Sequence, residues 1–366
     1  MKSEIKALTG LRFIAAFLVF IFHVNMRSKM LFLPWPVYNI VSHGAFGVTV
    51  FFVLSGFLLT YSHMRDFPNG QMRDSYYVRQ FFFKRVARIY PAYLVGLIFF
   101  ACAGLLFGQL PELDALLADT LMVQAILPSI SMKWYGSGAW SVSIEIFFYI
   151  IFPFLLPILI RIKKKIILWL LLFIIISVET FGGFSHTIWP QYVSYPLMYA
   201  NPLFRCSEFI AGMIASLLVF RFNWRVKEYH AISLLLVTCA YIAGFGPHFI
   251  GFVAHNWLVV PCIIVVLAAI IDISQTKFLR LLTHDWLLYA GRVSYCFYLA
   301  QLPIFYIQDL YLQSHLSLPW WSAPITLLAT CATGAFLHHF IELPAHRWLI
   351  DRNKHRQLML AQSSGA

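Results

Sequence analysis

The sequence predicts an all-α protein that crosses a membrane many times, and three observations lead to this prediction. Of the 366 residues, 60% are hydrophobic and 11% are charged, whereas a soluble domain is typically about 45–50% apolar and about 25% charged. Ten segments are apolar over about the 20 residues that a helix needs to cross a bilayer. Basic residues gather in the short segments between them. We therefore expect a polytopic transmembrane helical bundle and exclude a soluble or disordered chain.

The expected spans follow one another along most of the chain. They are 7–27, 44–63, 85–108, 142–160, 165–181, 203–221, 229–246, 255–273, 287–307 and 322–341. The first follows two lysines, as a signal peptide would, but no small-residue cleavage site comes after it, so we expect it to remain as a span. We assign residues 1–350 to one transmembrane domain and 351–366 to a short basic cytoplasmic tail.

The distribution of basic residues predicts the orientation. If the N-terminus is cytoplasmic, 20 basic residues fall in the inside segments and three, Arg27, Lys29 and Lys133, fall outside. Since Lys and Arg favour the cytoplasmic side, we predict a multi-pass membrane protein with both termini cytoplasmic. The net charge of +12 is explained by these segments and by sites for an acidic small molecule, so we expect membrane lipids and no nucleic acid as partners.

The cysteines give no sign of a disulfide framework or of a metal site. They are Cys102, Cys206, Cys239, Cys262, Cys296 and Cys331. Each stands alone, with neither CxxC nor Cys/His zinc spacing. We expect small buried hydrophobic residues and no bound metal.

Ionisable side chains within the spans form two expected layers. Placing such a group inside a membrane costs a few kcal/mol on insertion scales, so each one is a candidate functional residue. The inner layer contains Arg12, Arg85, Arg88 and Arg292. Guanidinium groups bind phosphate with paired hydrogen bonds, so this layer suits a phosphorylated ligand. The outer layer contains His23, Glu145, Arg205 and Glu208. A histidine beside carboxylates suits general base catalysis near neutral pH.

Each of these residues also has a structural interpretation, which the sequence leaves open. The lone histidine of the first span can serve only as a hydrogen-bonding group between helices. The inner arginines can be positive-inside anchors. Arg205 can form a structural pair with Glu145 or with Glu208, and we expect His338 and His339 to be structural.

Seven motifs occur in a fixed order along the chain. They are LTGLRFIAAFLVFIFH (8–23), GVTVFFVLSGF (47–57), KRVARIYPAY (84–93), WSVSIEIFFY (140–149), NPLFRCSEFIAG (201–212), RVSYCFYLAQLP (292–303) and IELP (341–344). With this order and spacing, the chain resembles the acyltransferase-3 family of integral membrane O-acyltransferases over about residues 5–350.

The resemblance implies about ten transmembrane helices, a cytoplasmic acyl-CoA donor, usually acetyl-CoA, and a hydroxyl acceptor on a glycan or lipid-linked saccharide. The motif positions that match the family's functional elements are Arg12, His23, Arg85, Arg88, Trp140, Ser141, Ser143 and Glu145. Many members carry a fused extracytoplasmic esterase-like domain. This chain stops at residue 366, so we expect the stand-alone form, acting alone or with a separate extracytoplasmic partner.

These residues suggest a mechanism that needs no permanently bound cofactor. The donor phosphates dock against Arg85 and Arg88, with Arg12 and Arg292 as further contacts. His23, oriented by Glu145, removes the proton of the acceptor hydroxyl as it attacks the thioester. Direct transfer and an acyl-histidine intermediate both remain open. Candidates for oxyanion or substrate contacts are Ser55, Trp140, Ser141, Ser143, Arg205 and Glu208.

Two departures from the family pattern keep other functions open. Thr49 stands where the family commonly has Asp, at the expected depth of His23, and Gln301 stands where it often has His. A proton-coupled transporter that uses His23, Glu145, Glu208 and Asp272 is one alternative, and a non-catalytic membrane partner is another. No motif identifies the acceptor. Lipopolysaccharide, exopolysaccharide, peptidoglycan and a small metabolite all remain open.

Overall fold

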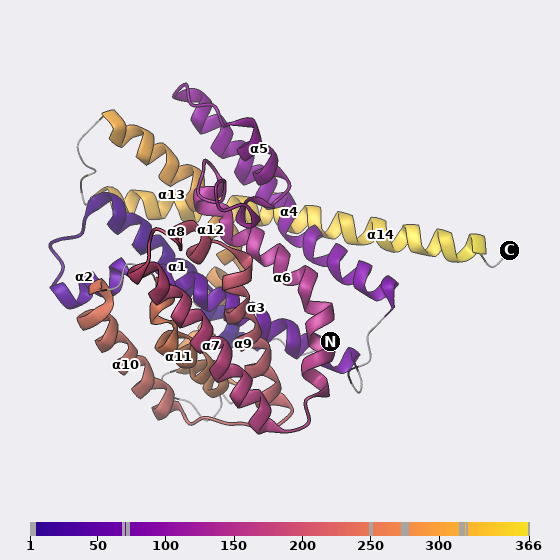
Figure 1. Cartoon of the computed structure of the whole chain (residues 1–366). Coiled ribbons are helices and arrows are strands. Elements are labelled where there is room, and N and C mark those ends of the chain that lie inside the picture. Colours follow the sequence, from indigo (N-terminus) through magenta and orange to yellow (C-terminus); the bar gives the residue numbers. More distant parts are fainter. Residues whose placement is uncertain are drawn as a thin grey trace.

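The computed structural model describes residues 5–67, 70, 74–248, 252–271, 277, 279–314, 319 and 321–364, and every regular element in this part of the chain is a helix (Figure 1). The helices of 15 residues or more are α1 (Lys6–Ser28), α3 (Phe46–His63), α4 (Ser75–Leu106), α6 (Gly136–Arg161), α7 (Lys165–Ile188), α9 (Pro202–Phe220), α10 (Glu228–Phe245), α11 (Asn256–Ile270), α12 (Asp285–Ser314), α13 (Ser322–Phe336) and α14 (Leu343–Ser364). Shorter helices are α2 (Trp35–Ser42), α5 (Leu113–Thr120) and α8 (Tyr195–Tyr199), with single turns η1 (Met64–Asp66), η3 (Gln124–Ile126), η4 (Gly246–His248), η5 (Phe252–His255), η7 (Leu279–Thr283) and η8 (Leu337–Glu342).

The prediction of an all-α polytopic bundle is confirmed. Nine helical segments in the described part of the chain are long and apolar enough to cross a membrane, and they coincide with nine of the ten expected spans. The tenth expected span, 287–307, lies within α12, which is 30 residues long. This helix carries more polar side chains and packs against α1, α4 and α13. Asp272, from the transporter alternative, lies outside the described residues.

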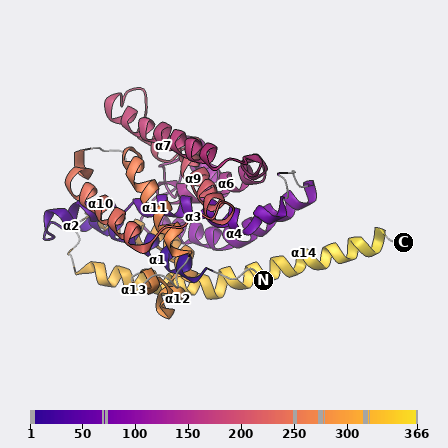
Figure 2. The same cartoon turned by 90° about the horizontal axis from the view of Figure 1, so that it is seen from below.

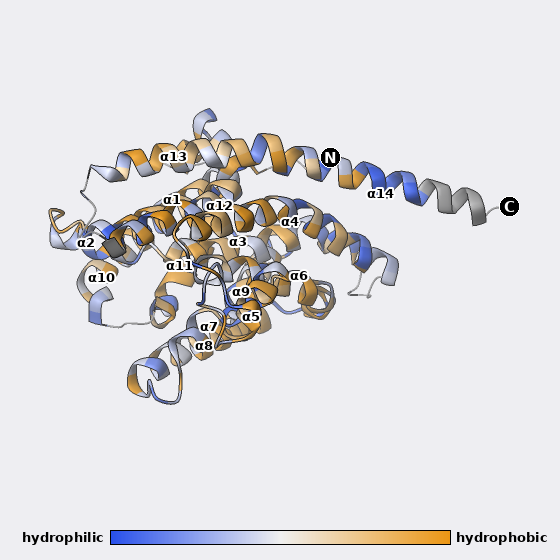
Figure 3. Cartoon of the chain, turned by 90° about the horizontal axis from the view of Figure 1, so that it is seen from above, coloured by the Kyte–Doolittle hydropathy of each residue, from blue (hydrophilic) through white to orange (hydrophobic). Residues whose placement is uncertain are grey.

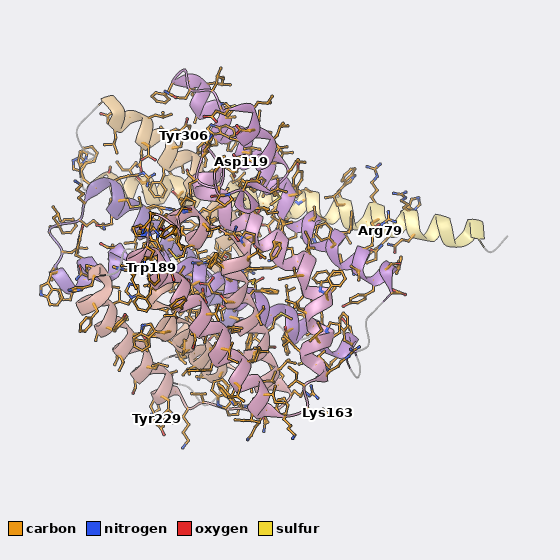
Figure 4. The ribbon with its side chains drawn as sticks, in the orientation of Figure 1. Arg79, Asp119, Lys163, Trp189, Tyr229 and Tyr306 are labelled. Carbon is orange, nitrogen blue, oxygen red and sulfur yellow. The ribbon has the colours of Figure 1, made fainter. Side chains whose placement is uncertain are left out.

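Labelled residues mark two opposite ends of the bundle. Figure 4 shows Lys163, from the connection after α6, and Tyr229, at the start of α10, at its lower edge, with Asp119 of α5 and Tyr306 of α12 in the upper part. Lys163 belongs to a segment that the charge distribution assigns to the inside, and Asp119 belongs to the long segment that it assigns to the outside.

The last span continues into a helical tail. Helices α13 and α14 are joined through η8, a π-helical turn, and together form one long rod along a side of the bundle (Figure 2). Figure 3 shows the rod changing from apolar to polar toward its C-terminal end. Residues 351–364, most of the expected short basic tail, lie in the same helix, α14, as the end of the expected transmembrane domain.

The connection between α4 and α6 packs onto the helices. The Tyr93 hydroxyl donates a hydrogen bond of 2.7 Å to the backbone carbonyl of Asp119, and the Gln124 amide donates to Tyr93. Burial raises the pKa of the Asp119 carboxyl to about 7, and the nearby Gly136 amide partly offsets this effect. The aspartate thus belongs to the packed part of the loop.

Glycines let several helices pack backbone against backbone. The hydrogen of Gly56 on α3 faces the carbonyl oxygen of Phe209 on α9, and that of Gly212 on α9 faces the carbonyl oxygen of Val53 on α3. A methyl group at either glycine would overlap these oxygens. Small residues at such positions let the helices approach closely. The resulting van der Waals packing holds helices together inside a membrane, where the hydrophobic effect does not act between them.

We expect Gly212→Ala to lower the thermal stability of the protein markedly. The added methyl overlaps backbone rather than a flexible side chain, and overpacking of this kind costs about 1–3 kcal/mol. Gly244→Ala on α10 is the matched control, because no atom lies within 4 Å of the added methyl. Thermal unfolding in detergent measures both variants, and equal melting temperatures would contradict the proposed contact.

Candidate functional site

A cavity of about 250 Å³ lies between α1, α3, α4, α6 and α12. Helix α3 lines it from Val48 to Ser62, a distance of roughly 21 Å at 1.5 Å per residue. Its charged lining residues are Arg12, Arg85, Arg88 and Glu145. The remaining wall is apolar and aromatic, with a few hydroxyl groups. A long ligand with an anionic end fits this division.

The charged part of the cavity is net positive. Three arginines face one carboxylate there, that of Glu145. The Tyr149 hydroxyl donates a hydrogen bond of 2.6 Å to Glu145, whose charge acts on Arg12 and Arg85. Because the wall holds more cations than anions, it favours an anionic ligand such as a phosphate group.

Arg88 is held at the cavity by a buried carboxylate from the end of the last span. Its guanidinium lies 4.0 Å from Glu342, to which His338 is hydrogen-bonded at 2.6 Å. The Cys296 thiol donates to the same carboxylate. The donor atoms of Cys296, His338 and Glu342 lie within 4.8 Å of one another, a grouping able to hold a metal ion. The sequence predicted no such set, because Cys296 stands far from the other two along the chain.

The hydroxyl groups of the cavity lie on α3, α6 and α12. Ser55 and Ser141, two of the candidates for oxyanion or substrate contacts, line it. Ser141 hydrogen-bonds at 2.8 Å to the Tyr298 hydroxyl, which donates to the carbonyl of Gly138. Ser143 instead accepts a hydrogen bond from the backbone amide of Ala125 and lies outside the lining. It anchors the connection between α4 and α6, so its expected oxyanion role is not supported by its position.

His23 lies outside the cavity lining, and its partner is not the one we expected. Its Nδ1 lies 3.1 Å from the amide oxygen of Gln301 on α12. The imidazole packs edge-on against Phe305. Glu145 faces the arginines instead. The expectation that Glu145 orients His23 was wrong because α6 begins at Gly136, which puts Glu145 roughly 14 Å along the helix and deeper than assumed.

Arg205 and Glu208 form a buried ion pair rather than a substrate site. The Arg205 Nε lies 3.0 Å from Glu208, and the side chains are 1% and 0% exposed. This arrangement settles which carboxylate pairs with Arg205. Asn256 donates to Glu208 and to Glu179, a second buried carboxylate that the sequence analysis did not single out.

Thr49 and Trp140 also belong to the surroundings of Arg205. The Thr49 hydroxyl accepts a hydrogen bond of 3.3 Å from the guanidinium, so its partner is Arg205 and not His23, the residue at its expected depth. The rings of Phe52, Trp140 and Tyr199 lie 5.3–5.7 Å from the guanidinium carbon. An aspartate at position 49 would therefore act on Arg205. With threonine at this position, Glu208 is the carboxylate that pairs with the arginine.

Arg292 does not join the other arginines. It is exposed, and its guanidinium lies over the ring of Tyr289. The cavity lining does not include it. A helix of 3.6 residues per turn presents each side chain in one direction, so position along the span did not predict where Arg292 points.

Comparison with known proteins assigns the chain to a family. A family model described as "Acyltransferase domain" matches residues 5–339. The protein named acyltransferase MdmB of Streptomyces mycarofaciens is 27% identical over 94% of this chain and 92% of its own length. O-acetyltransferase OatA of Staphylococcus aureus is 24% identical over 93% of this chain, which spans 57% of OatA. An uncharacterised Haemophilus influenzae protein is 24% identical over 58% of the chain.

No solved structure matches the chain significantly. The family model nevertheless covers nearly all of the described helices, including every helix that lines the cavity. The protein is therefore a multi-pass membrane enzyme that belongs to this family of acyltransferases.

Proposed function

We propose that this membrane O-acyltransferase moves a short acyl group, in the first instance acetyl, from cytoplasmic acyl-CoA to a hydroxyl of a cell-surface glycan or lipid-linked saccharide. The supporting observation is the cavity, which combines three arginines with a long apolar wall. Coenzyme A has the same division, with phosphates at one end and a slender thioester arm at the other. The relatives MdmB and OatA come from bacteria, which supports a bacterial cytoplasmic membrane as its location.

In this proposal, the donor phosphates bind Arg85 and Arg88, with Arg12 deeper in the cavity. The pantetheine arm extends along α3 toward Ser141 and Tyr298. Arg292 has no part in donor binding, since it lies outside the lining. The cavity thus brings the thioester from the inner arginines toward the half of the bundle that contains His23.

The chemical step is a direct transfer. His23 takes the proton of the acceptor hydroxyl while its oxygen forms a bond to the thioester carbonyl carbon. The tetrahedral oxyanion then collapses, the carbon–sulfur bond breaks, and the proton on His23 passes to the leaving thiolate. Ser55 is the oxyanion donor that the cavity offers, and Ser141 can serve as a second one only by releasing its hydrogen bond to Tyr298. An acyl-histidine intermediate is the alternative, which a burst of thiol release would reveal.

Vesicles that contain the purified protein test this function. They are supplied with acetyl-CoA labelled in the acetyl group and with glycan and glycolipid fractions, and empty vesicles are the control. We expect base-labile label to enter one fraction together with stoichiometric release of free thiol. If the protein binds acetyl-CoA but neither transfers nor hydrolyses it, the catalytic proposal is wrong and the binding-partner interpretation replaces it.

A further inference from the structure

The side-chain amide of Gln301 has one partner for its oxygen, His23, and another for its nitrogen, Ala16. Gln301 is fully buried, at 0% exposure, on α12. Its oxygen faces Nδ1 of His23 at 3.1 Å, and its nitrogen faces the backbone carbonyl of Ala16 at 3.4 Å. A carbonyl oxygen only accepts hydrogen bonds, so the NH₂ group of the amide must point toward Ala16. Rotation of the amide by 180° would set two oxygens against each other.

This orientation fixes the proton on the imidazole. The amide oxygen also only accepts, so the Nδ1 of His23 that faces it must carry hydrogen. In neutral imidazole the other ring nitrogen, Nε2, then keeps its lone pair. The contact therefore selects one of two tautomers, although the amide brings no charge of its own.

The other described polar and charged groups around His23 do not form a hydrogen bond that could fix the proton on the imidazole in place of the Gln301 amide. Arg27, one turn further along α1, acts on the imidazole, but its guanidinium is paired with Asp309 of α12. On the other side, the ring of Phe22 touches Phe252, and His43 lies beyond that ring. Thr49 of α3 is bonded to Arg205. Among the described residues, Gln301 is the polar side chain that contacts the ring through a hydrogen bond.

We propose that Gln301 is the positioning residue for His23. Its amide oxygen holds the proton on Nδ1 and leaves Nε2 as the nitrogen that removes the proton from the acceptor hydroxyl. This inference rests on the proposed function for its consequence, whereas the tautomer itself is a property of the resting protein. A neutral amide also stabilises the imidazolium less than a carboxylate would, so His23 acts as a weak base that readily returns its proton to the thiolate.

The tautomer is tested first, without activity. Nitrogen-15 labelling of the 13 histidines, with His23→Ala to assign the signal, distinguishes a protonated from an unprotonated ring nitrogen in the protein in lipid nanodiscs. We expect Nδ1 of His23 to be protonated in the wild type and this preference to be lost in Gln301→Met, which keeps the shape but has no amide. A wild-type proton on Nε2 would overturn the inference, even if acyl transfer were established.

Kinetics then test the positioning role. We expect Gln301→Met to lower kcat for transfer by about tenfold to a hundredfold, with donor KM within twofold of wild type, because Gln301 does not line the cavity. Gln301→Glu retains the acceptor and should recover kcat above that of Gln301→Met. The carboxylate introduced by Gln301→Glu should also move the midpoint of the acidic limb of the kcat/KM profile to higher pH by about one unit. An unchanged kcat in Gln301→Met, or a pH profile identical in Gln301→Glu, would contradict the proposal.

Discussion

His23→Ala should lower kcat for acyl transfer by about 10²–10⁴-fold, the range that a positioned general base contributes. The apparent affinity for acyl-CoA should change little, since His23 is not among the residues that line the arginine-containing cavity. Steady-state kinetics with labelled acetyl-CoA, combined with equilibrium binding of a non-reactive CoA thioether, separate these two effects. The variant therefore distinguishes chemistry from donor binding.

His230→Ala is the matched control for this substitution. His230 is an exposed histidine near the start of α10, and its removal leaves the candidate site intact. We expect wild-type rates for it and unchanged melting temperatures for both histidine variants. If His23→Ala retains more than a tenth of the wild-type kcat, the general base is another group and the proposed mechanism fails.

Removal of Arg85 or Arg88 should weaken the binding of the acyl-CoA donor rather than slow the acyl transfer step. Charge-assisted hydrogen bonds are worth about 1.5–3 kcal/mol, so we expect Arg85→Ala or Arg88→Ala to raise the KM for acetyl-CoA by about ten- to a hundredfold. Arg85→Lys should recover only part of this loss, because lysine lacks the paired geometry of guanidinium. Kinetics at saturating acceptor and direct binding of CoA measure the effect.

Arg79 provides a control on the same helix. It lies on the N-terminal part of α4, exposed and away from the cavity, and Figure 4 shows it near the projecting α14. Arg79→Ala removes the same charge while leaving the donor site complete. A KM for Arg85→Ala no higher than that of Arg79→Ala would show that net charge alone, and not the cavity, attracts the donor.

The sequence predicted the helices well because the membrane imposes a length and a hydropathy that each span must meet. The span within α12 was identified although that helix does not reach the hydropathy of the other nine. The polar residues that lower its hydropathy, such as Tyr298 and Gln301, face other helices. Motif spacing also located three arginines and Glu145 that the fold brings to one cavity.

The partners of the polar residues could not be predicted in the same way. Position along a span gives an approximate depth, but the direction of each side chain depends on how the helices rotate and pack. For this reason, Thr49, which lies at the expected depth of His23, in fact contacts Arg205. Gln301 was recognised as unusual, yet its contact with His23 joins residues 278 positions apart and required the tertiary structure.

The glycine contacts distinguish helices that pack backbone against backbone from helices that meet through side chains. Besides the α3–α9 contact, Gly47 of α3 rests on the backbone of Ala15 in α1, and Gly291 of α12 rests on that of Thr9. Four helices are thereby interlocked backbone to backbone, and sliding any of them would force main-chain atoms together. Helix α6 meets α12 through the flexible side chain of Leu302 at Gly138. We therefore expect α1, α3 and α12 to act as a fixed template, whereas α6 can widen the cavity for a bulky thioester by shifting Leu302 and releasing the hydrogen bonds to Tyr298.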